Sequence, residues 1–158
     1  MSSAAASRYG KNRSTNRAFD ACLKNGKIIL FPRASRLANK KLAAAAEDLA
    51  EAWDRFGHGK YKYATINGYY AVFHAARTLV YSKGYRERSN YCLAAALEAL
   101  FVDCGLLENR YVVMLKATMA LREQADYAGL FSEEGASLSI ANAEEFIRAA
   151  RDRLKSGR

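Results

Sequence analysis

Five polar side chains stand at the ends or in the middle of mostly apolar stretches, and they are the groups through which this chain could do chemistry. His74 and Arg77 lie one helical turn apart inside the apolar run 66–84, while Arg122, Asp126 and Tyr127 close a second run. An arginine is suited to planar, bidentate recognition of a carboxylate or a phosphate. A buried arginine is also costly unless it is paired. These residues therefore need partners, either within the protein or on a ligand.

The residues alone leave three arrangements open. Arg122 and Asp126 have i, i+4 spacing and can form a local ion pair on one helix. Alternatively, Arg77 and Arg122 converge on one carboxylate or on a ligand phosphate. In the third arrangement, an internal salt-bridge network orients two helices and binds nothing.

Standard catalytic and metal-binding patterns are missing from the sequence. The chain has two histidines, and no helical Glu pair is followed by the His that a di-iron site would need. No nucleophile elbow or phosphate loop occurs. His58 lies between two glycines and is expected to be an exposed turn residue. We expect neither a metal site nor a cofactor.

The elements that must position these side chains are helices. Composition and apolar periodicity predict an all-α fold, an antiparallel up-and-down bundle of four long helices plus a short N-terminal helix. The run 62–83 is apolar nearly all round, so it is predicted to be the buried central helix. The segments 27–31, 85–88 and 132–138 are interpreted as a buried connector, a turn and a polar loop. Helices are expected at about 14–24, 35–56, 62–83, 90–104, 109–128 and 139–155.

One predicted helix face needs separate mention because it sets what packs on the central helix. In the helix 35–56, Leu42, Leu49, Trp53 and Phe56 form the expected apolar stripe, and Asp48 is assigned to the opposite, solvent face.

The positive charge is concentrated in the first quarter of the chain. Residues 1–41 hold ten Lys and Arg against one acid, whereas the remainder holds fifteen of each sign, which accounts for the net charge of +9. We expect residues 1–13 to be a flexible basic leader and residues 14–158 to be one helical domain. The leader either solubilises the chain or attracts an anionic partner. The basic side chains that would make that attraction are Arg8, Lys11, Arg13 and Arg17.

The three cysteines, Cys22, Cys92 and Cys104, lack the spacing of a disulfide framework or a zinc site. They are interpreted as small apolar core residues, which indicates a reducing, cytoplasmic location. No apolar run reaches the ~18–20 residues that a membrane crossing needs, so we expect no membrane partner.

Taken together, three segments resemble the HEPN domain family. They are the central helix pattern YYAVFHAAR followed by TLVYSKGY, the segment RSNYCL, and the helix end REQADY, and the resemblance covers about residues 18–155. It implies a helical bundle that usually forms a homodimer, a possible nucleotidyltransferase-type protein partner, and RNA or nucleotide binding. It also implies, for many members, a metal-independent endoribonuclease or toxin activity.

The resemblance implies that ribonuclease members use an arginine and a histidine as the catalytic pair, with the His as general base. Arg122 matches that arginine, but Tyr127 stands where the His would follow, and Asn90 stands where relatives often have a Ser-His pair. We therefore expect a non-catalytic or weakly catalytic binding module of the toxin–antitoxin or defence type, with Arg77, Arg122 and Asp126 at the binding site. The alternatives are an endoribonuclease using Arg122 with Tyr127 or His74, and a structural assembly subunit.

Overall fold

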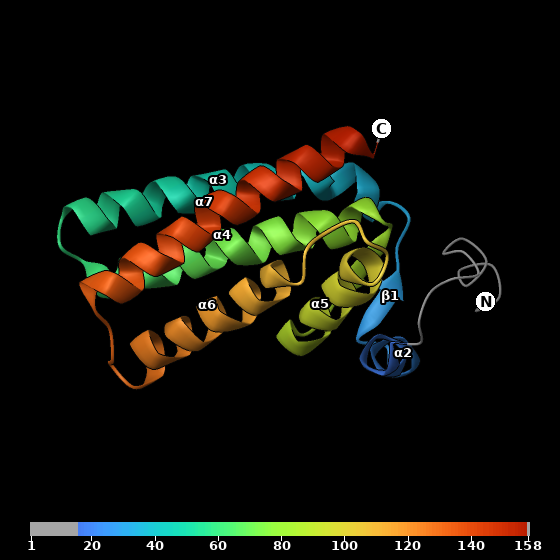
Figure 1. The fold of residues 1–158 in the computed structure, drawn as a ribbon, viewed down its shortest axis with the longest axis horizontal. Helices are drawn as coiled ribbons and strands as arrows, with labels where there is room; N and C mark the ends of the chain where they lie inside the picture. Colours follow the sequence, from blue (N-terminus) through green and yellow to red (C-terminus); the bar gives the residue numbers. More distant parts are fainter. Residues whose placement is uncertain (1–15, 158) are drawn as a thin grey trace.

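A computed structural model describes residues 16–157 (Figure 1). Four long helices make up most of it, and two short helices and two short strands lie at one end. In chain order the elements are α2 (Arg17–Lys24), β1 (Ile28–Leu30), α3 (Ala34–Gly57), α4 (Tyr61–Ser82), β2 (Tyr85–Glu87), α5 (Asn90–Leu97), a π-helical turn η1 (Glu98–Val102), α6 (Arg110–Tyr127) and α7 (Glu133–Ser156).

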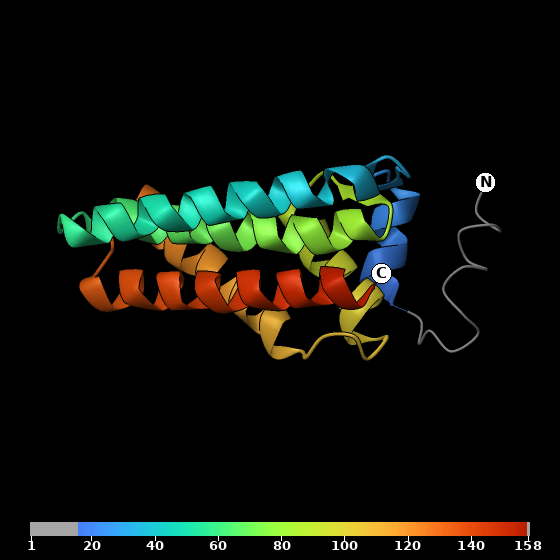
Figure 2. The ribbon, with the colours of Figure 1, turned by 90° about the horizontal axis from the view of Figure 1, so that it is seen from above.

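The predicted all-α bundle and its central helix are confirmed. Helix α4 packs against α3, α6 and α7; it lies between the overlapping pair α3 and α7 and the helix α6 in Figure 1, and beside α3 in Figure 2. More than half of its residues are buried, including Val72, Leu79 and Val80. Its apolar character therefore reflects contact with neighbouring helices on most sides.

Small residues allow α4 to approach its neighbours closely. The buried residues of α3 are all alanines, and a Cβ added to Gly68 of α4 would lie 2.3 Å from Ser139 Oγ of α7. Ser139 Oγ donates a hydrogen bond to the Thr65 carbonyl oxygen at 2.9 Å. The predicted stripe on α3 was wrong at one end, because the Trp53 side chain is 50% exposed and packs edge-on against Phe56.

Three local assignments differ from the sequence expectation. The segments 27–31 and 85–88 contain β1 and β2, which pair antiparallel with Ile28 opposite Glu87. Helix α5 ends in a π-helical turn, where one long helix was expected. Helix α7 begins inside the predicted loop 132–138, because Ser132 Oγ accepts a hydrogen bond from Gly135 N and Glu133 and Glu134 lie at the positive end of the helix dipole.

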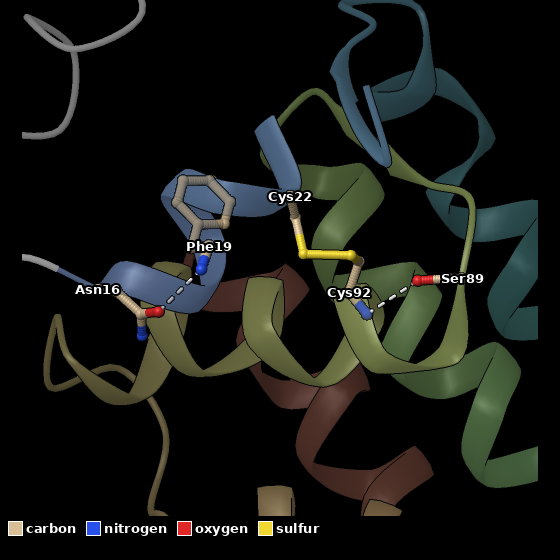
Figure 3. Close-up of a disulfide and its surroundings, with 5 residues drawn as sticks. All are labelled: Asn16, Phe19, Cys22, Ser89 and Cys92. Atoms are coloured by element: carbon tan, nitrogen blue, oxygen red, sulfur yellow. Dashed lines mark hydrogen bonds between the residues drawn. A yellow bond between two sulfur atoms is a disulfide. The ribbon is translucent and has the colours of Figure 1, made fainter. Parts of the chain in front are cut away.

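The prediction that all three cysteines are free thiols is wrong. Cys22 of α2 and Cys92 of α5 form a disulfide with their Cα atoms 5.9 Å apart, and both residues are buried (Figure 3). This pairing could not be predicted from spacing, because 70 positions separate the two cysteines. Disulfides persist in oxidising environments, so the argument from cysteines to a reducing compartment loses its premise. Only Cys104 is a free thiol among the described residues, and it is exposed.

Two further predictions concern the basic leader and the membrane. The basic leader 1–13, with Arg8, Lys11 and Arg13, lies outside the described residues. Within residues 16–157, no helix combines the length and apolarity that a membrane crossing requires.

Reduction of the disulfide should loosen α2 and β1 before the rest of the bundle. The chain-entropy model gives up to about 4 kcal/mol for a loop of this length, and α2 otherwise holds to α5 through few buried residues, Phe19 among them. We expect Cys92→Ser to lower the Tm by roughly 10 °C and to speed amide exchange in 17–30. Cys104→Ser is the matched control and should change neither; equal exchange in both variants would contradict the prediction.

Candidate functional site

Arg122 lies near the end of α6 among aromatic side chains. Its guanidinium carbon is 5.5 Å from the ring centroid of Tyr69 and 5.4 Å from that of Tyr127. Its Nη2 is 3.5 Å from Asp126 Oδ2, and its side chain is 20% exposed. The predicted i, i+4 pair with Asp126 is therefore present, but at a distance longer than a charge-assisted hydrogen bond.

Tyr69 and Tyr70 belong to this site, although the sequence analysis did not select them. Burial raises the pKa of the Tyr69 hydroxyl, while Arg122 and the side chain of Asn90 oppose the shift. Tyr69 thus stays protonated at neutral pH, and Tyr70 lies close enough to act on Arg122 electrostatically. The sequence feature that could have identified them is the Tyr-Tyr pair one turn before His74. It was missed because the apolar run around the pair was interpreted as core. Asn90 reaches the site through Tyr69.

Arg77 has its charge answered by Glu87 on β2. Arg77 Nε lies 2.7 Å from Glu87 Oε1, and Arg77 Nη2 donates to the Tyr81 hydroxyl at 2.5 Å. The guanidinium carbon is also 5.2 Å from the Phe73 ring centroid. Glu87 is 5% exposed, and burial raises the pKa of its carboxyl against the opposing effect of Arg77. The structure therefore gives Arg77 and Arg122 separate carboxylates, and sequence reasoning missed Glu87 because β2 was interpreted as a turn.

His74 points to α3. Its Nε2 lies 3.5 Å from Asp48 Oδ2, so Asp48 faces α4, where the sequence expectation had it facing solvent. Burial, and then the positive charges of Arg77 and Lys41, lower the pKa of His74. Burial also raises the pKa of Asp48, with Glu47 and Glu51 adding to the shift. His74 is therefore a neutral imidazole at pH 7.

His74 and Arg122 do not meet within one protein chain. A chain of aromatic contacts lies between them: Arg122 contacts the Tyr69 ring, the Tyr69 and Phe73 ring centroids are 5.9 Å apart, and those of Phe73 and His74 are 5.5 Å apart. Tyr127 contacts Arg122 directly and is 76% exposed. Of the three residues proposed as catalytic, the structure brings together Arg122 and Tyr127 and holds His74 apart.

The one described residue of the basic set is at the other end of the bundle. Arg17 is exposed at the start of α2, which lies beside α5, whereas the end of α6 that carries Arg122 lies near the α6–α7 connection (Figure 1). Across residues 16–157, no group of three His, Cys, Asp or Glu side chains could hold a metal ion.

Half-buried residues follow one face of α4, which is otherwise covered by its neighbours. We call this face the α4 strip; it consists of Ile66, Asn67, Tyr70, Phe73, His74 and Arg77. Buried side-chain atoms without a hydrogen-bond partner collect here. In the described part of the chain they are His74 Nδ1 and Arg77 Nε on the strip, with Glu87 Oε2 and Arg122 Nε in residues that contact α4 side chains. Arg77 Nε still has an ion-pair partner in Glu87 Oε1 at 2.7 Å, but the two atoms lack hydrogen-bond alignment. Such atoms are costly when left unsatisfied.

The comparisons with known proteins give a family and a relative. The family model of the HEPN domain matches residues 38–157, which begin in α3 and include α4, α6 and α7. A protein of Methanocaldococcus jannaschii named "Putative toxin MJ0605" is 30% identical over 112 residues, 70% of this chain and 84% of that protein. The matched range contains Arg77, Arg122 and Tyr127, but it excludes α2 and Cys22.

The low pKa of His74 can be measured by an NMR pH titration. We expect His74 to titrate below a histidine in an unstructured peptide, because burial, Arg77 and Lys41 all disfavour the imidazolium. Lys41→Met should raise the pKa of His74, and Lys40→Met, which removes the neighbouring exposed charge, should change it less. A pKa above that of the peptide would show that Asp48 dominates and would overturn the assignment.

Proposed function

Because this chain belongs to the HEPN domain family, we propose that it is a toxin–antitoxin or defence-type module that binds RNA or nucleotide phosphates at Arg122. The observation that carries the proposal is the state of the Arg122 guanidinium. It is partly exposed and held by two tyrosine rings, its Nε has no hydrogen-bond partner, and its carboxylate neighbour is 3.5 Å away. An arginine in this state still has donors to offer to a phosphate.

The neighbours of Arg122 suit a nucleic acid or a nucleotide better than a simple anion. The Tyr127 ring is 76% exposed and lies beside the guanidinium, so a base could stack on it while a phosphate contacts Arg122. Basic residues of the leader, with Arg17, would add salt-sensitive attraction that does not depend on sequence.

Binding is favoured over cleavage because His74, the imidazole base of the alternative, does not contact Arg122. Tyr127 is the side chain in contact with Arg122, and a phenol is a less common general base than an imidazole. His74 is neutral and chemically competent as a base, but rings separate it from Arg122. The alternative function, a metal-independent endoribonuclease using Arg122 with Tyr127 or His74, is supported by that neutral imidazole and by the toxin name of the M. jannaschii relative.

A second copy of the chain is the partner that we propose for the α4 strip. The residues of the strip are partly exposed and include aromatic and charged side chains. Two of its nitrogen atoms, His74 Nδ1 and Arg77 Nε, lack a hydrogen-bond partner. A two-fold interface would bury the same strip on both copies and could supply those partners. It would also bring the two Arg122 sites toward one cleft. A nucleotidyltransferase-type protein remains a further proposed partner, supported by the family alone.

RNA binding should depend on Arg122. In fluorescence anisotropy with a short single-stranded RNA, Arg122→Ala should weaken binding at least about tenfold, because one charge-assisted contact contributes about 1.5–3 kcal/mol. Arg148→Ala removes an equally charged, exposed residue of α7 and should weaken binding less than twofold. Equal losses would mean that the RNA responds only to net charge.

The same RNA distinguishes binding from cleavage. Incubated with wild-type protein and a chelator, it should stay intact on a denaturing gel. Cleavage that disappears in the double variant His74→Ala, Tyr127→Phe would establish the endoribonuclease alternative instead. Cleavage that survives in that variant would remove both residues from a catalytic role.

Dimer formation should depend on the α4 strip. Asn67 lies on the strip and is half-buried, so Asn67→Arg places like charges across a two-fold interface. In sedimentation equilibrium we expect wild type at twice the monomer mass and Asn67→Arg shifted toward the monomer. Asn39→Arg makes the same change on the exposed side of α3 and should stay dimeric. A monomeric wild type at micromolar concentration would contradict the proposal.

A further inference from the structure

We propose that Asp126 competes with the anionic ligand for Arg122, so that the carboxylate occupies the phosphate position in the free protein and leaves it on binding. This inference rests on the proposed function and adds a regulating residue to its site. The ligand group it concerns is a phosphate or pyrophosphate.

The geometry of the pair marks Asp126 as a weakly held occupant. Its Oδ2 is 3.5 Å from Arg122 Nη2, whereas charge-assisted pairs of this kind lie at about 2.7–2.9 Å. The Asp126 side chain is already 38% exposed, so its rotation into solvent needs little rearrangement. Exposed ion pairs of i, i+4 spacing contribute little to stability, which leaves the carboxylate easy to displace.

The edge of the guanidinium that Asp126 partly covers is the edge suited to an oxyanion. Nε and the Nη nitrogens are donors in a fixed fork that matches two oxygens of a phosphate. Arg122 Nε is buried with no hydrogen-bond partner, Nη2 has a long contact to Asp126, and the Tyr70 side chain hydrogen-bonds the same guanidinium. A phosphate could satisfy both donors, whereas Asp126 satisfies neither well.

The surroundings hold the arginine in place while the ligand changes. Tyr69 is 3% exposed and contacts Arg122 from α4, a helix fixed by the core. Tyr127, next to Asp126 at the end of α6, has room to reorient because most of its surface faces solvent. Displacement of Asp126 and reorientation of Tyr127 would uncover Nε without moving the guanidinium.

The test compares two carboxylates on the same helix. Asp126→Asn and Glu123→Gln each remove one negative charge near the site, but only Asp126 pairs with Arg122. The probe is inorganic pyrophosphate, whose binding is measured by isothermal titration calorimetry, and the Arg122 Nε–Hε signal is followed by NMR in the variants that keep Arg122. We expect Asp126→Asn to bind pyrophosphate at least fivefold more tightly than wild type and Glu123→Gln to change binding less than twofold. The double variant Asp126→Asn, Arg122→Lys should lose the gain.

Each other result has a defined meaning. Equal gains in both carboxylate variants, no gain in Asp126→Asn, or no pyrophosphate binding by any variant would overturn the inference. Tighter pyrophosphate binding by Asp126→Asn, together with no binding of RNA or of a nucleotide by wild type, would leave Asp126 as a competitor and reject the proposed function alone. Thermal unfolding of each variant checks that the fold is retained.

Discussion

The ion pair between Arg77 and Glu87 is the interaction on which the N-terminal end of this bundle depends. Arg77 belongs to a helix covered on most sides, and Glu87 is 5% exposed on a three-residue strand. Breaking such a pair leaves a buried charge and typically costs 3–5 kcal/mol. Strand β2 is held in place by β1, and β1 follows the helix α2 that the disulfide ties to α5. The elements that look peripheral in the ribbon therefore support the charge at its centre.

Because neighbouring helices cover most of α4, its polar functional side chains lie on its one open face. His74 and Arg77 lie on the α4 strip, and Tyr69 connects the same helix to Arg122. Asp48 of α3 lies beside the neutral His74, and Glu87 of β2 pairs with Arg77 at 2.7 Å, while Asp126 lies 3.5 Å from Arg122. Of the two arginines, Arg122 therefore has the more distant carboxylate, and this is why it is the centre of the proposed binding site.

Periodicity predicted what depends on one helix at a time, and missed what depends on two distant segments. The burial of α4 and the Arg122–Asp126 spacing were visible in the sequence, because both are i, i+3 or i, i+4 properties of a single helix. The disulfide and the Arg77–Glu87 pair join residues from separate elements, and three-residue strands have no usable period. Trp53 failed for another reason. Alanines fill the α3–α4 contact, so the large apolar side chain remains at the surface.

The disulfide also changes the covalent topology of the molecule. Joining Cys22 to Cys92 closes a ring of chain that contains β1, α3, α4 and β2, while α6 and α7 lie outside it. A backbone cut in the exposed turn at 57–60 would open that ring without separating its two pieces, since α3 and α4 would still be linked through sulfur. The helix pair at the centre of the bundle would thus remain one molecule even after the shortest path between its two helices had been broken.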